Sequence, residues 1–318
     1  MRVVFFGTPE FAVPSLRALV GEGFDVAAVV TQPDAAQGRS RSQLIPPPVK
    51  VAAASEDLLV LQPEKPTDPA FLKQLRDLQP DIGVVVAYGH ILKPELLTLP
   101  PRGMVNVHPS LLPGLRGAAP VEWAIIRGHE TTGVTIMQLD AGMDSGPVLH
   151  QIPHRIGSDV TGGDLSAHLA EMGAQALIET LAMLEQSDPP PQPVPQNESR
   201  ATFAPKLTRE TARIDWAKDA RAIGCLIRGL DPRPGAWTEL KGTEIKLFSP
   251  KVMEPPFPGT GAPGQVLSAQ GSLVIATGEG GAAGAAVEVF EVQPAGKARM
   301  PAEEWLRGAR LQPGARFS

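Results

Sequence analysis

Short apolar runs alternate with helical patterns along the first half of the chain, and this alternation restricts the possible folds more than any other feature. Runs rich in β-branched residues occupy positions 3–7, 26–31, 58–61 and 81–88. Helical patterns separate them at 11–22, 49–56 and 69–78. Strands that alternate with helices are typical of a parallel sheet covered on both faces. We therefore expect an α/β fold with a Rossmann-like, mostly parallel sheet.

The same pattern continues beyond residue 100. Strands are expected at 104–108, 133–139 and 148–155, the last a candidate antiparallel strand, and helices at 121–127 and 164–185. The turn after the first strand, Gly7-Thr8-Pro9, does not have the Gly-x-Gly-x-x-Gly spacing that brings a dinucleotide pyrophosphate close to the backbone. An NAD-binding oxidoreductase is therefore disfavoured.

Two polar residues mark one face of the strand at 104–108. Asn106 and His108 are two positions apart, so they point to the same side of the strand. Prolines and a Gly-Ala-Ala turn follow before residue 121 and end the strand. In an open α/β sheet, ligands bind beyond the carboxyl ends of the strands. We therefore expect an amide and an imidazole together beside a ligand site.

A carboxylate, Asp144, is the third candidate group. It lies in a glycine-rich loop at 139–147, where a polar side chain has no packing role. Asn106 and His108 can donate hydrogen bonds to an oxygen that becomes negative during acyl transfer, and a carboxylate beside His108 favours the charged imidazole. Taken singly, the three residues are more simply explained as a turn former, a strand-end histidine and a loop acid.

Taken together, these motifs are specific. Asn-x-His at 106–108, Ser-Leu-Leu-Pro at 110–113 and Asp-Ser-Gly-Pro at 144–147 make the chain resemble the methionyl-tRNA formyltransferase family. Further matching stretches lie at 6–12, 31–34, 84–89, 133–138, 212–216 and 293–297, so the resemblance covers nearly the whole length. It implies an enzyme that moves the formyl group of 10-formyltetrahydrofolate to the α-amino group of methionyl-initiator tRNA.

The resemblance also implies roles for individual residues. Asn106 and His108 bind the formyl oxygen and stabilise the oxyanion, while Asp144 orients His108, keeps it charged and accepts or relays the amine proton. The family's folate-contacting segment matches Ser110, Leu111, Leu112 and Pro113. The nucleophile belongs to the substrate, and the chain has no Gly-x-Ser-x-Gly elbow. The histidines share no metal-site spacing, so we expect no metal.

A proline-rich segment at 187–195 separates two parts of the chain and is typical of a semi-rigid linker without helix or strand. A helical pattern at 219–229 then precedes short apolar strands at 236–240, 244–248, 264–268, 272–277 and 286–292. Five short strands with turn residues between them favour a small β-barrel, with the OB fold as the natural candidate. We assign 1–186 to a formyltransferase catalytic domain, 187–204 to the linker and 205–318 to an OB-like barrel, which by the family resemblance binds tRNA.

The two parts differ in charge. Residues 1–205 carry 14 Lys and Arg against 22 Asp and Glu, whereas residues 206–318 carry 15 against 12, which suits a nucleic-acid partner. The polar segment 32–43 has no apolar period, and we expect a loop. Arg39 and Arg41 in it are expected to meet tRNA phosphates, against the alternative of a solvated loop with incidental arginines. The glycine-rich segment 278–284 is also expected to be a loop.

The single cysteine, Cys225, excludes an internal disulfide and a cysteine-based metal cluster, and its apolar surroundings predict a buried thiol. No apolar run reaches the roughly 18 residues of a transmembrane helix. The apolar run at the start of the chain is too short for a signal peptide. We therefore expect a cytoplasmic protein, and a monomer.

Two other functions fit parts of this pattern. A formyltransferase for a small amine, such as glycinamide ribonucleotide or an amino sugar, can use the same Asn, His and Asp set, but we expect such a chain to end near residue 200 or to carry an unrelated second domain. A non-catalytic RNA-binding protein on a Rossmann-like scaffold has no need of Asn106, His108 and Asp144 together. Formyl release in the presence of formylfolate and charged tRNA separates the three hypotheses.

Overall fold

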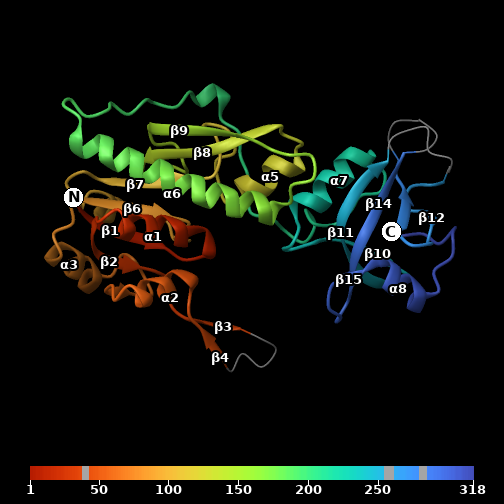
Figure 1. Ribbon diagram of the computed structural model, residues 1–318. Helices are drawn as coiled ribbons and strands as arrows, with labels where there is room; N and C mark the ends of the chain where they lie inside the picture. The colour runs from red at the N-terminus through yellow and green to blue at the C-terminus, as the bar shows by residue number, and fades with distance from the viewer. Residues whose placement is uncertain (38–42, 254–260, 279–284) are drawn as a thin grey trace. The chain divides into compact units, whose positions relative to one another are not determined.

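The computed structural model describes residues 1–37, 43–253, 261–278 and 285–318, and the chain divides into two compact units. The first unit contains Met1–Pro120, Thr131–Arg155 and Ser166–Ala204. The second contains Val121–Glu130, Ile156–Leu165 and Pro205–Ser318. Figure 1 labels the elements of both units, which are described separately below.

The first unit is built on a seven-stranded sheet in the order β5-β2-β1-β6-β7-β8-β9. Its strands are β1 (Arg2–Gly7), β2 (Asp25–Val30), β5 (Val60–Leu61), β6 (Ile82–Val86), β7 (Met104–His108), β8 (Thr131–Gln138) and β9 (Val148–Arg155). The pairs from β5 to β7 are parallel, while β8 is antiparallel to β7 and β9 is antiparallel to β8. The predicted α/β class with a mostly parallel sheet is therefore confirmed.

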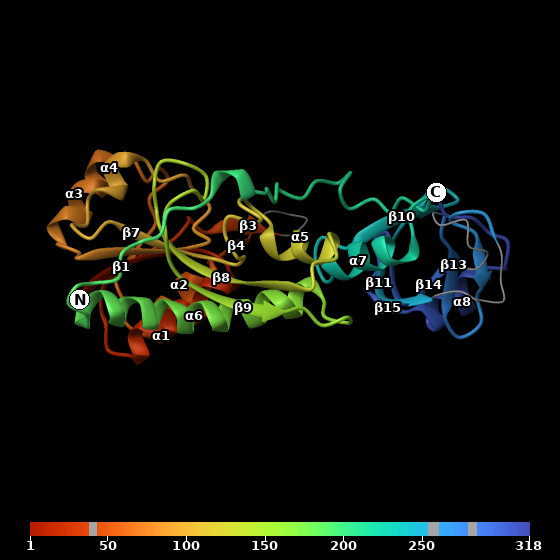
Figure 2. The same cartoon turned by 90° about the horizontal axis from the view of Figure 1, so that it is seen from above.

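Helices cover both faces of this sheet (Figure 2). α1 (Val13–Gly21), which follows the 3-10 turn η1 (Glu10–Ala12), lies on one face with α2 (Pro48–Ser55) and the long α6 (Gly162–Gln186). α3 (Pro69–Asp77) and α4 (Pro94–Leu97) lie on the other, where side chains such as Phe71 and Leu75 pack against Val4 and Phe6 of β1. Alternate residues of β1 serve opposite faces, as the pleat requires. The four-residue α4 was not predicted, because one turn has no detectable period.

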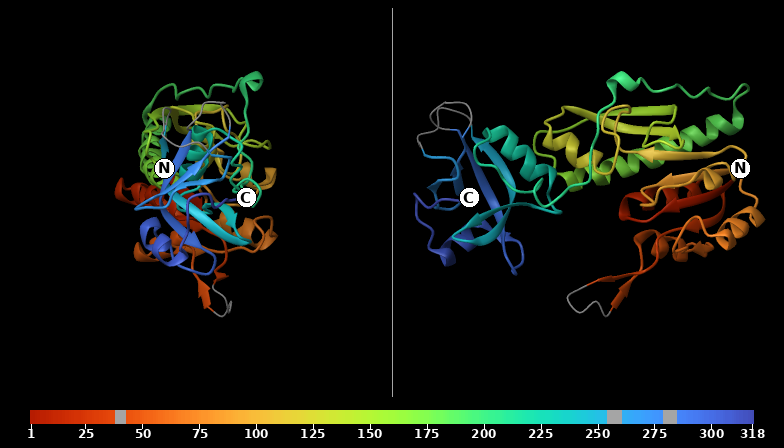
Figure 3. Two further views of the ribbon diagram at one scale, coloured as in Figure 1. Left: turned by 90° about the vertical axis from the view of Figure 1, so that its right-hand side faces the viewer. Right: turned by 180° about the vertical axis from the view of Figure 1, so that it is seen from behind.

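The segment 32–43 is not simply a loop, so that prediction is wrong at its ends. β3 (Ala35–Gln37) pairs antiparallel with β4 (Gln43–Ile45). Figure 3 shows this strand pair projecting away from the sheet. Backbone hydrogen bonds hold such a pair without an apolar face, and Leu44 is 64% exposed. An argument from hydrophobic period alone therefore could not find it.

The second unit contains a curled antiparallel sheet in the order β10-β11-β14-β13-β12, with β15 paired to β14. The strands are β10 (Ala236–Leu240), β11 (Thr243–Met253), β12 (Val266–Ser268), β13 (Leu273–Ala276), β14 (Ala286–Pro294) and β15 (Met300–Pro301). Near the end of the chain, Phe317 forms a bridge with Leu240, and Arg316 forms one with Gln265 beside β12. The chain end thus lies between the two outer strands, which gives the partly closed barrel that the sequence predicted.

Three helices belong wholly or largely to this unit: α5 (Pro120–Ile126), α7 (Ala220–Gly229) and α8 (Ala302–Ala309). α8 and β15 were not predicted. β11 continues to Met253, beyond its predicted end at Phe248. Cys225 in α7 is buried, as expected. The glycine-rich segment expected at 278–284 lies, except for Gly278, outside the described residues. Within the described ranges, no helix is long and apolar enough to cross a membrane.

Candidate active site

β7 carries the Asn106 and His108 pair in the middle of the first unit's sheet. Asn106 lies opposite Val85 of β6 and Met137 of β8. The His108 side chain is only 5% exposed, whereas Asn106 is half-buried. None of the described residues hydrogen-bonds to the Asn106 amide. Its donor groups are therefore available to a ligand beside the end of β7.

Both ring nitrogens of His108 face oxygen atoms. Nε2 lies 3.0 Å from the carbonyl oxygen of Leu115, and since a carbonyl only accepts, Nε2 carries the hydrogen. Leu115 adopts a left-handed conformation with φ of 60°, and its N–H donates to Thr202 Oγ1 at 2.9 Å. This contact fixes the Nε2–H tautomer in neutral His108, so its Nδ1 is the atom that can accept a proton.

Asp144, in the loop after β8, lies beside Nδ1 of His108. Its Oδ2 lies 3.7 Å from Nδ1 of His108, and the same oxygen accepts a hydrogen bond of 2.8 Å from the Gly117 N–H. The sequence therefore identified three residues that the fold brings to one place: the Asn106 and His108 strand face, and a carboxylate directed at the imidazole. The arrangement provides hydrogen-bond donors and a proton acceptor in a largely buried site.

Burial and the neighbouring carboxylate act on the pKa of His108 in opposite directions. Burial lowers the pKa of His108 below its ordinary value, and the Asp144 carboxylate and Leu115 carbonyl only partly oppose this effect. Asp144 has a limited influence because 3.7 Å exceeds hydrogen-bond length and because its Oδ2 is already shared with Gly117. Burial therefore opposes the predicted effect of Asp144, and the charged state of His108 stays a prediction. The direction of the shift favours a neutral imidazole, which can accept a proton.

Most polar groups of the segment expected to contact folate form hydrogen bonds within the protein. Ser110 Oγ donates to the Gly114 carbonyl at 2.6 Å, and the Ser110 carbonyl accepts from Thr135 Oγ1. The Leu112 N–H and carbonyl bond to Thr135 and Gln151, and the Leu112 side chain is buried. Leu111 and Pro113 are half-buried and present the more accessible surface. The folate role of this segment stays a prediction.

Several neighbours of the site were not found from the sequence. The Leu115 carbonyl and Gly117 N–H are backbone groups, and a pattern of side-chain types does not predict their positions. Gln196 Nε2 donates to the carbonyl of Asp144 at 2.8 Å, although residue 196 lies in the predicted linker. Arg39 and Arg41 lie outside the described residues. Within those that are described, no cluster of three His, Cys, Asp or Glu side chains could hold a metal.

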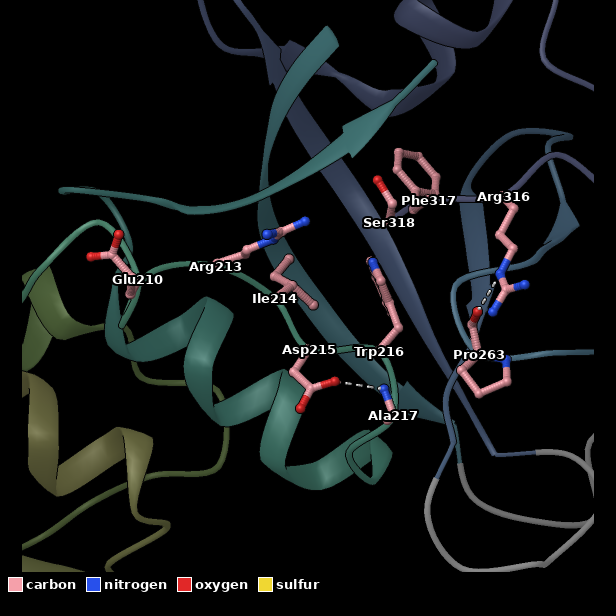
Figure 4. A pocket seen from close by; sticks show the side chains of 10 residues that line it. All are labelled: Glu210, Arg213, Ile214, Asp215, Trp216, Ala217, Pro263, Arg316, Phe317 and Ser318. Atoms are coloured by element: carbon pink, nitrogen blue, oxygen red, sulfur yellow. Dashed lines mark hydrogen bonds between the residues drawn. The ribbon is translucent and has the colours of Figure 1, made fainter. Parts of the chain in front are cut away.

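The second unit has a pocket of about 770 Å³ (Figure 4). Two cationic side chains lie on its wall: Arg213, whose guanidinium is 5.3 Å from the Trp237 ring centre, and Arg316, which donates to the Pro263 carbonyl. Neither arginine forms an ion pair with another described residue. The remaining lining residues are Glu210, Ile214, Asp215, Trp216, Ala217, Phe317 and Ser318.

Comparison with known proteins covers both units. The family model for formyl transferase matches residues 1–181, and the model for the formyl transferase C-terminal domain matches residues 206–310. A methionyl-tRNA formyltransferase from Thermobifida fusca is 45% identical over 319 residues, which covers 100% of this chain and 99% of that protein. A methionyl-tRNA formyltransferase from Acetivibrio thermocellus is 44% identical and covers 99% of this chain and 98% of its own length.

Solved structures share the fold at lower identity. An N-formyltransferase from Helicobacter canadensis, in complex with folinic acid and dTDP-3-aminofucose, superposes with a TM-score of 0.68 at 17% identity and covers 92% of this chain and 98% of its own. HypX from Aquifex aeolicus in complex with tetrahydrofolic acid has a TM-score of 0.63 at 20% identity. That match covers 96% of this chain but 47% of HypX, so this chain spans about half of HypX.

Proposed function

The chain belongs to the methionyl-tRNA formyltransferase family, and from this premise we propose how its residues perform the reaction. It transfers the formyl group of 10-formyltetrahydrofolate to the α-amino group of methionyl-initiator tRNA and so produces N-formylmethionyl-tRNA for translation initiation. The observation that carries this function is the 44–45% identity to methionyl-tRNA formyltransferases over nearly the whole of both chains. The second domain alone does not separate the two functions: the expectation that a small-amine formyltransferase ends near residue 200 or carries an unrelated second domain is wrong, because the N-formyltransferase bound to dTDP-3-aminofucose shares the fold over 92% of this chain, although at only 17% identity.

The acceptor amine needs little activation. A free α-amino group has a pKa of about 7.7–8.0, so a substantial fraction is neutral near pH 7.5. Its attack on the formyl carbon forms a new C–N bond and turns the formyl oxygen into an oxyanion. We propose that the Asn106 amide donates to this oxygen, since its donors are not used within the described protein.

The attacking amine must then lose a proton. We propose that His108 Nδ1 accepts it, because Nε2 already hydrogen-bonds to the Leu115 carbonyl and burial favours the neutral ring. Asp144, 3.7 Å away, stabilises the imidazolium that results, and this cation in turn stabilises the oxyanion. The same proton then passes to the folate nitrogen as the old C–N bond breaks. Tetrahydrofolate leaves and His108 returns to its neutral form.

Folate is proposed to lie along the segment after β7. Leu111 and Pro113 offer apolar surface for it, while the hydrogen bonds from Ser110 and Leu112 into the protein hold the segment rigid. This division fits the usual architecture of small-molecule sites, in which apolar walls surround a few fixed polar groups. No described side-chain cluster suits a metal, and the proposed steps need none.

Two regions are proposed to bind the tRNA. Arg39 and Arg41 come between β3 and β4 in the sequence, and guanidinium groups suit phosphates of the acceptor end. Arg213 and Arg316 provide cations on the second unit, on the wall of the pocket shown in Figure 4. Substrate capture by the second unit agrees with its positive charge balance.

The function is tested by supplying 10-formyltetrahydrofolate with three acceptors: methionyl-initiator tRNA, glycinamide ribonucleotide and an amino sugar nucleotide. We expect rapid formylation of the charged tRNA alone. Faster formylation of either small amine would contradict the proposal. We further propose that the enzyme acts as a monomer in the cytoplasm, where initiator tRNA is charged, since all residues of the proposed catalytic set come from one chain. A mass measurement in solution tests the monomer.

A further inference from the structure

Gln196, in the segment predicted to be a linker, hydrogen-bonds directly to the loop that carries Asp144. Its Nε2 donates to the carbonyl of Asp144 at 2.8 Å and to the carbonyl of Gly146 at 2.7 Å. One side-chain amide therefore joins two carbonyls on either side of Ser145. Residue 196 lies between the spans 1–181 and 206–310 that the family models match, so neither family model includes it.

The Asp144 loop needs such support. Asp144 has a φ of +48°, a left-handed backbone conformation that is uncommon for non-glycine residues. Gly146 is buried against β8, where a Cβ would overlap the carbonyl oxygen of Gln138. The two hydrogen bonds from Gln196 act on the backbone at this point.

Gln196 is itself fixed by a buried arginine. Arg116 donates from Nε and Nη2 to Gln196 Oε1, at 3.1 and 2.8 Å, and its side chain is 4% exposed. The remaining guanidinium donors form a two-point contact with both carboxylate oxygens of Glu198, at 2.7 and 2.8 Å. This pairing neutralises the buried charge and defines which end of the Gln196 amide faces the arginine and which faces the loop.

These contacts form a closed ring around the catalytic carboxylate. The Arg116 guanidinium binds Gln196, Gln196 binds the Asp144 carbonyl, and the Asp144 carboxylate accepts from the N–H of Gly117, the residue after Arg116. The backbone of Arg116 is also fixed, since it pairs with the Thr202 carbonyl and the Ala204 N–H. A ring of this kind sets the position of the Asp144 side chain relative to His108 from both its backbone and its carboxylate.

We propose that Gln196, oriented by Arg116, is a positioning residue for Asp144 in formyl transfer. The inference rests on the proposed function of Asp144. It makes the end of the proline-rich segment part of the active-site scaffold. A displacement of about 1 Å in a catalytic group can cost about 100-fold in rate, so the loss of this contact is expected to lower kcat substantially.

The test compares Gln196→Glu and Gln196→Ala with the parent. Gln196→Glu preserves size and an acceptor for Arg116, but it places a carboxylate oxygen where Nε2 donates to two carbonyls. Gln192→Ala is the matched control, because Gln192 is an exposed glutamine in the same predicted linker, residues 187–204. Initial rates are measured with 10-formyltetrahydrofolate and methionyl-initiator tRNA across a pH series, alongside thermal melts.

We expect both Gln196 variants to lose at least tenfold in kcat, with the KM values for folate and tRNA within about threefold of the parent and with a shifted pH profile of kcat. A shift is expected because a displaced Asp144 no longer supports the pKa of His108 to the same degree. A folded Gln196→Glu variant with the parent's kcat would overturn the proposal, and so would a reduced kcat with the parent's pH profile. An inactive parent in the same assay would instead contradict the proposed function.

Discussion

The Oδ2 atom of Asp144 lies 3.7 Å from Nδ1 of His108, and the same oxygen accepts a hydrogen bond from the Gly117 N–H. The carboxylate is therefore held by the backbone, not by the histidine it serves. His108 in turn is held by the Leu115 carbonyl through Nε2. Each of the two side chains is held by its own backbone contact. His108 Nδ1 can therefore accept a proton without movement of either side chain. The following predictions start from this arrangement.

Asp144→Asn is expected to lower kcat by about 10²–10⁴-fold, the usual contribution of a positioned acid or base. The amide keeps the size of the side chain but cannot stabilise the imidazolium. Asp140→Asn is a suitable control, because Asp140 lies in the same loop and, among the described residues, forms its hydrogen bonds with Ser145 and the Gly142 N–H. Single-turnover formylation of charged tRNA measures the effect. Full activity with the parent's pH profile in Asp144→Asn would rule out the assigned pair.

His108→Ala is expected to abolish most turnover and to leave folate binding largely intact. The imidazole acts on charge that develops in the transition state, so its loss affects kcat more than ground-state affinity. Fluorescence titration with a folate analogue, followed by kinetics at saturating substrate, separates the two effects. Near-normal kcat in the folded variant would remove His108 from the proposed mechanism.

The pH dependence follows from the direction of the His108 shift. Burial lowers the pKa of His108 from the ordinary 6.5, and only the neutral ring can take the amine proton. We therefore expect kcat to be level near pH 7.5 and to fall, as the pH decreases, through a midpoint below 6.5. Measuring kcat at saturating substrates avoids the titration of the free amine. A midpoint well above 6.5 would mean that Asp144 outweighs burial.

Tyr88→Phe is expected to preserve or raise stability. The Tyr88 hydroxyl is buried, finds no hydrogen-bond partner among the described residues, and has a pKa raised to about 12 by burial. A buried polar group without a partner costs about 1–3 kcal/mol, and phenylalanine removes it while it keeps the edge-to-face contact with Phe6. Urea unfolding of both proteins tests this. A loss of more than 1 kcal/mol would reveal a partner for the hydroxyl.

The sequence predicted the sheet of the first unit because its strands are long enough to show uninterrupted burial, as in Ile82–Val86, and because helices with clear periods separate them. The elements it missed, α4, β15 and the β3–β4 pair, are too short for a period to be seen. α8 is a different case: its apolar residues at 302, 305, 306 and 309 follow the helical period, so the sequence does carry a signal for this helix.

The candidate site was only partly predictable. Residues that carry chemistry in their side chains, Asn106, His108 and Asp144, could be found from residue type and spacing. The groups that position them are backbone atoms of Leu115 and Gly117, or a glutamine in a low-complexity segment, and composition there indicates only a linker. The end of this segment also includes the turn η2 (Glu198–Arg200). A truncation near Pro195 would therefore remove Gln196 as well as the second unit.

The arginine pairs provide the last prediction, since they divide tRNA binding between two regions of an intact chain. Replacing Arg39 and Arg41 with alanine, or Arg213 and Arg316 with alanine, is expected to raise KM for methionyl-initiator tRNA with little change in kcat or in KM for folate. Arg307→Ala is the control, because this exposed arginine of α8 pairs with Glu303.

The dependence of KM on salt concentration distinguishes the loss of a phosphate contact from a general loss of affinity. Each lost contact to a nucleic-acid phosphate releases one counterion fewer, so the slope of log KM against log salt should fall by about 0.7–0.9 per contact. If both double variants lower the slope by similar amounts and Arg307→Ala leaves it unchanged, the two regions bind the tRNA backbone together. If the slope is unchanged for Arg39 and Arg41, these two arginines do not contact tRNA phosphates. The same result for Arg213 and Arg316 would mean that the pocket in Figure 4 does not contact tRNA phosphates.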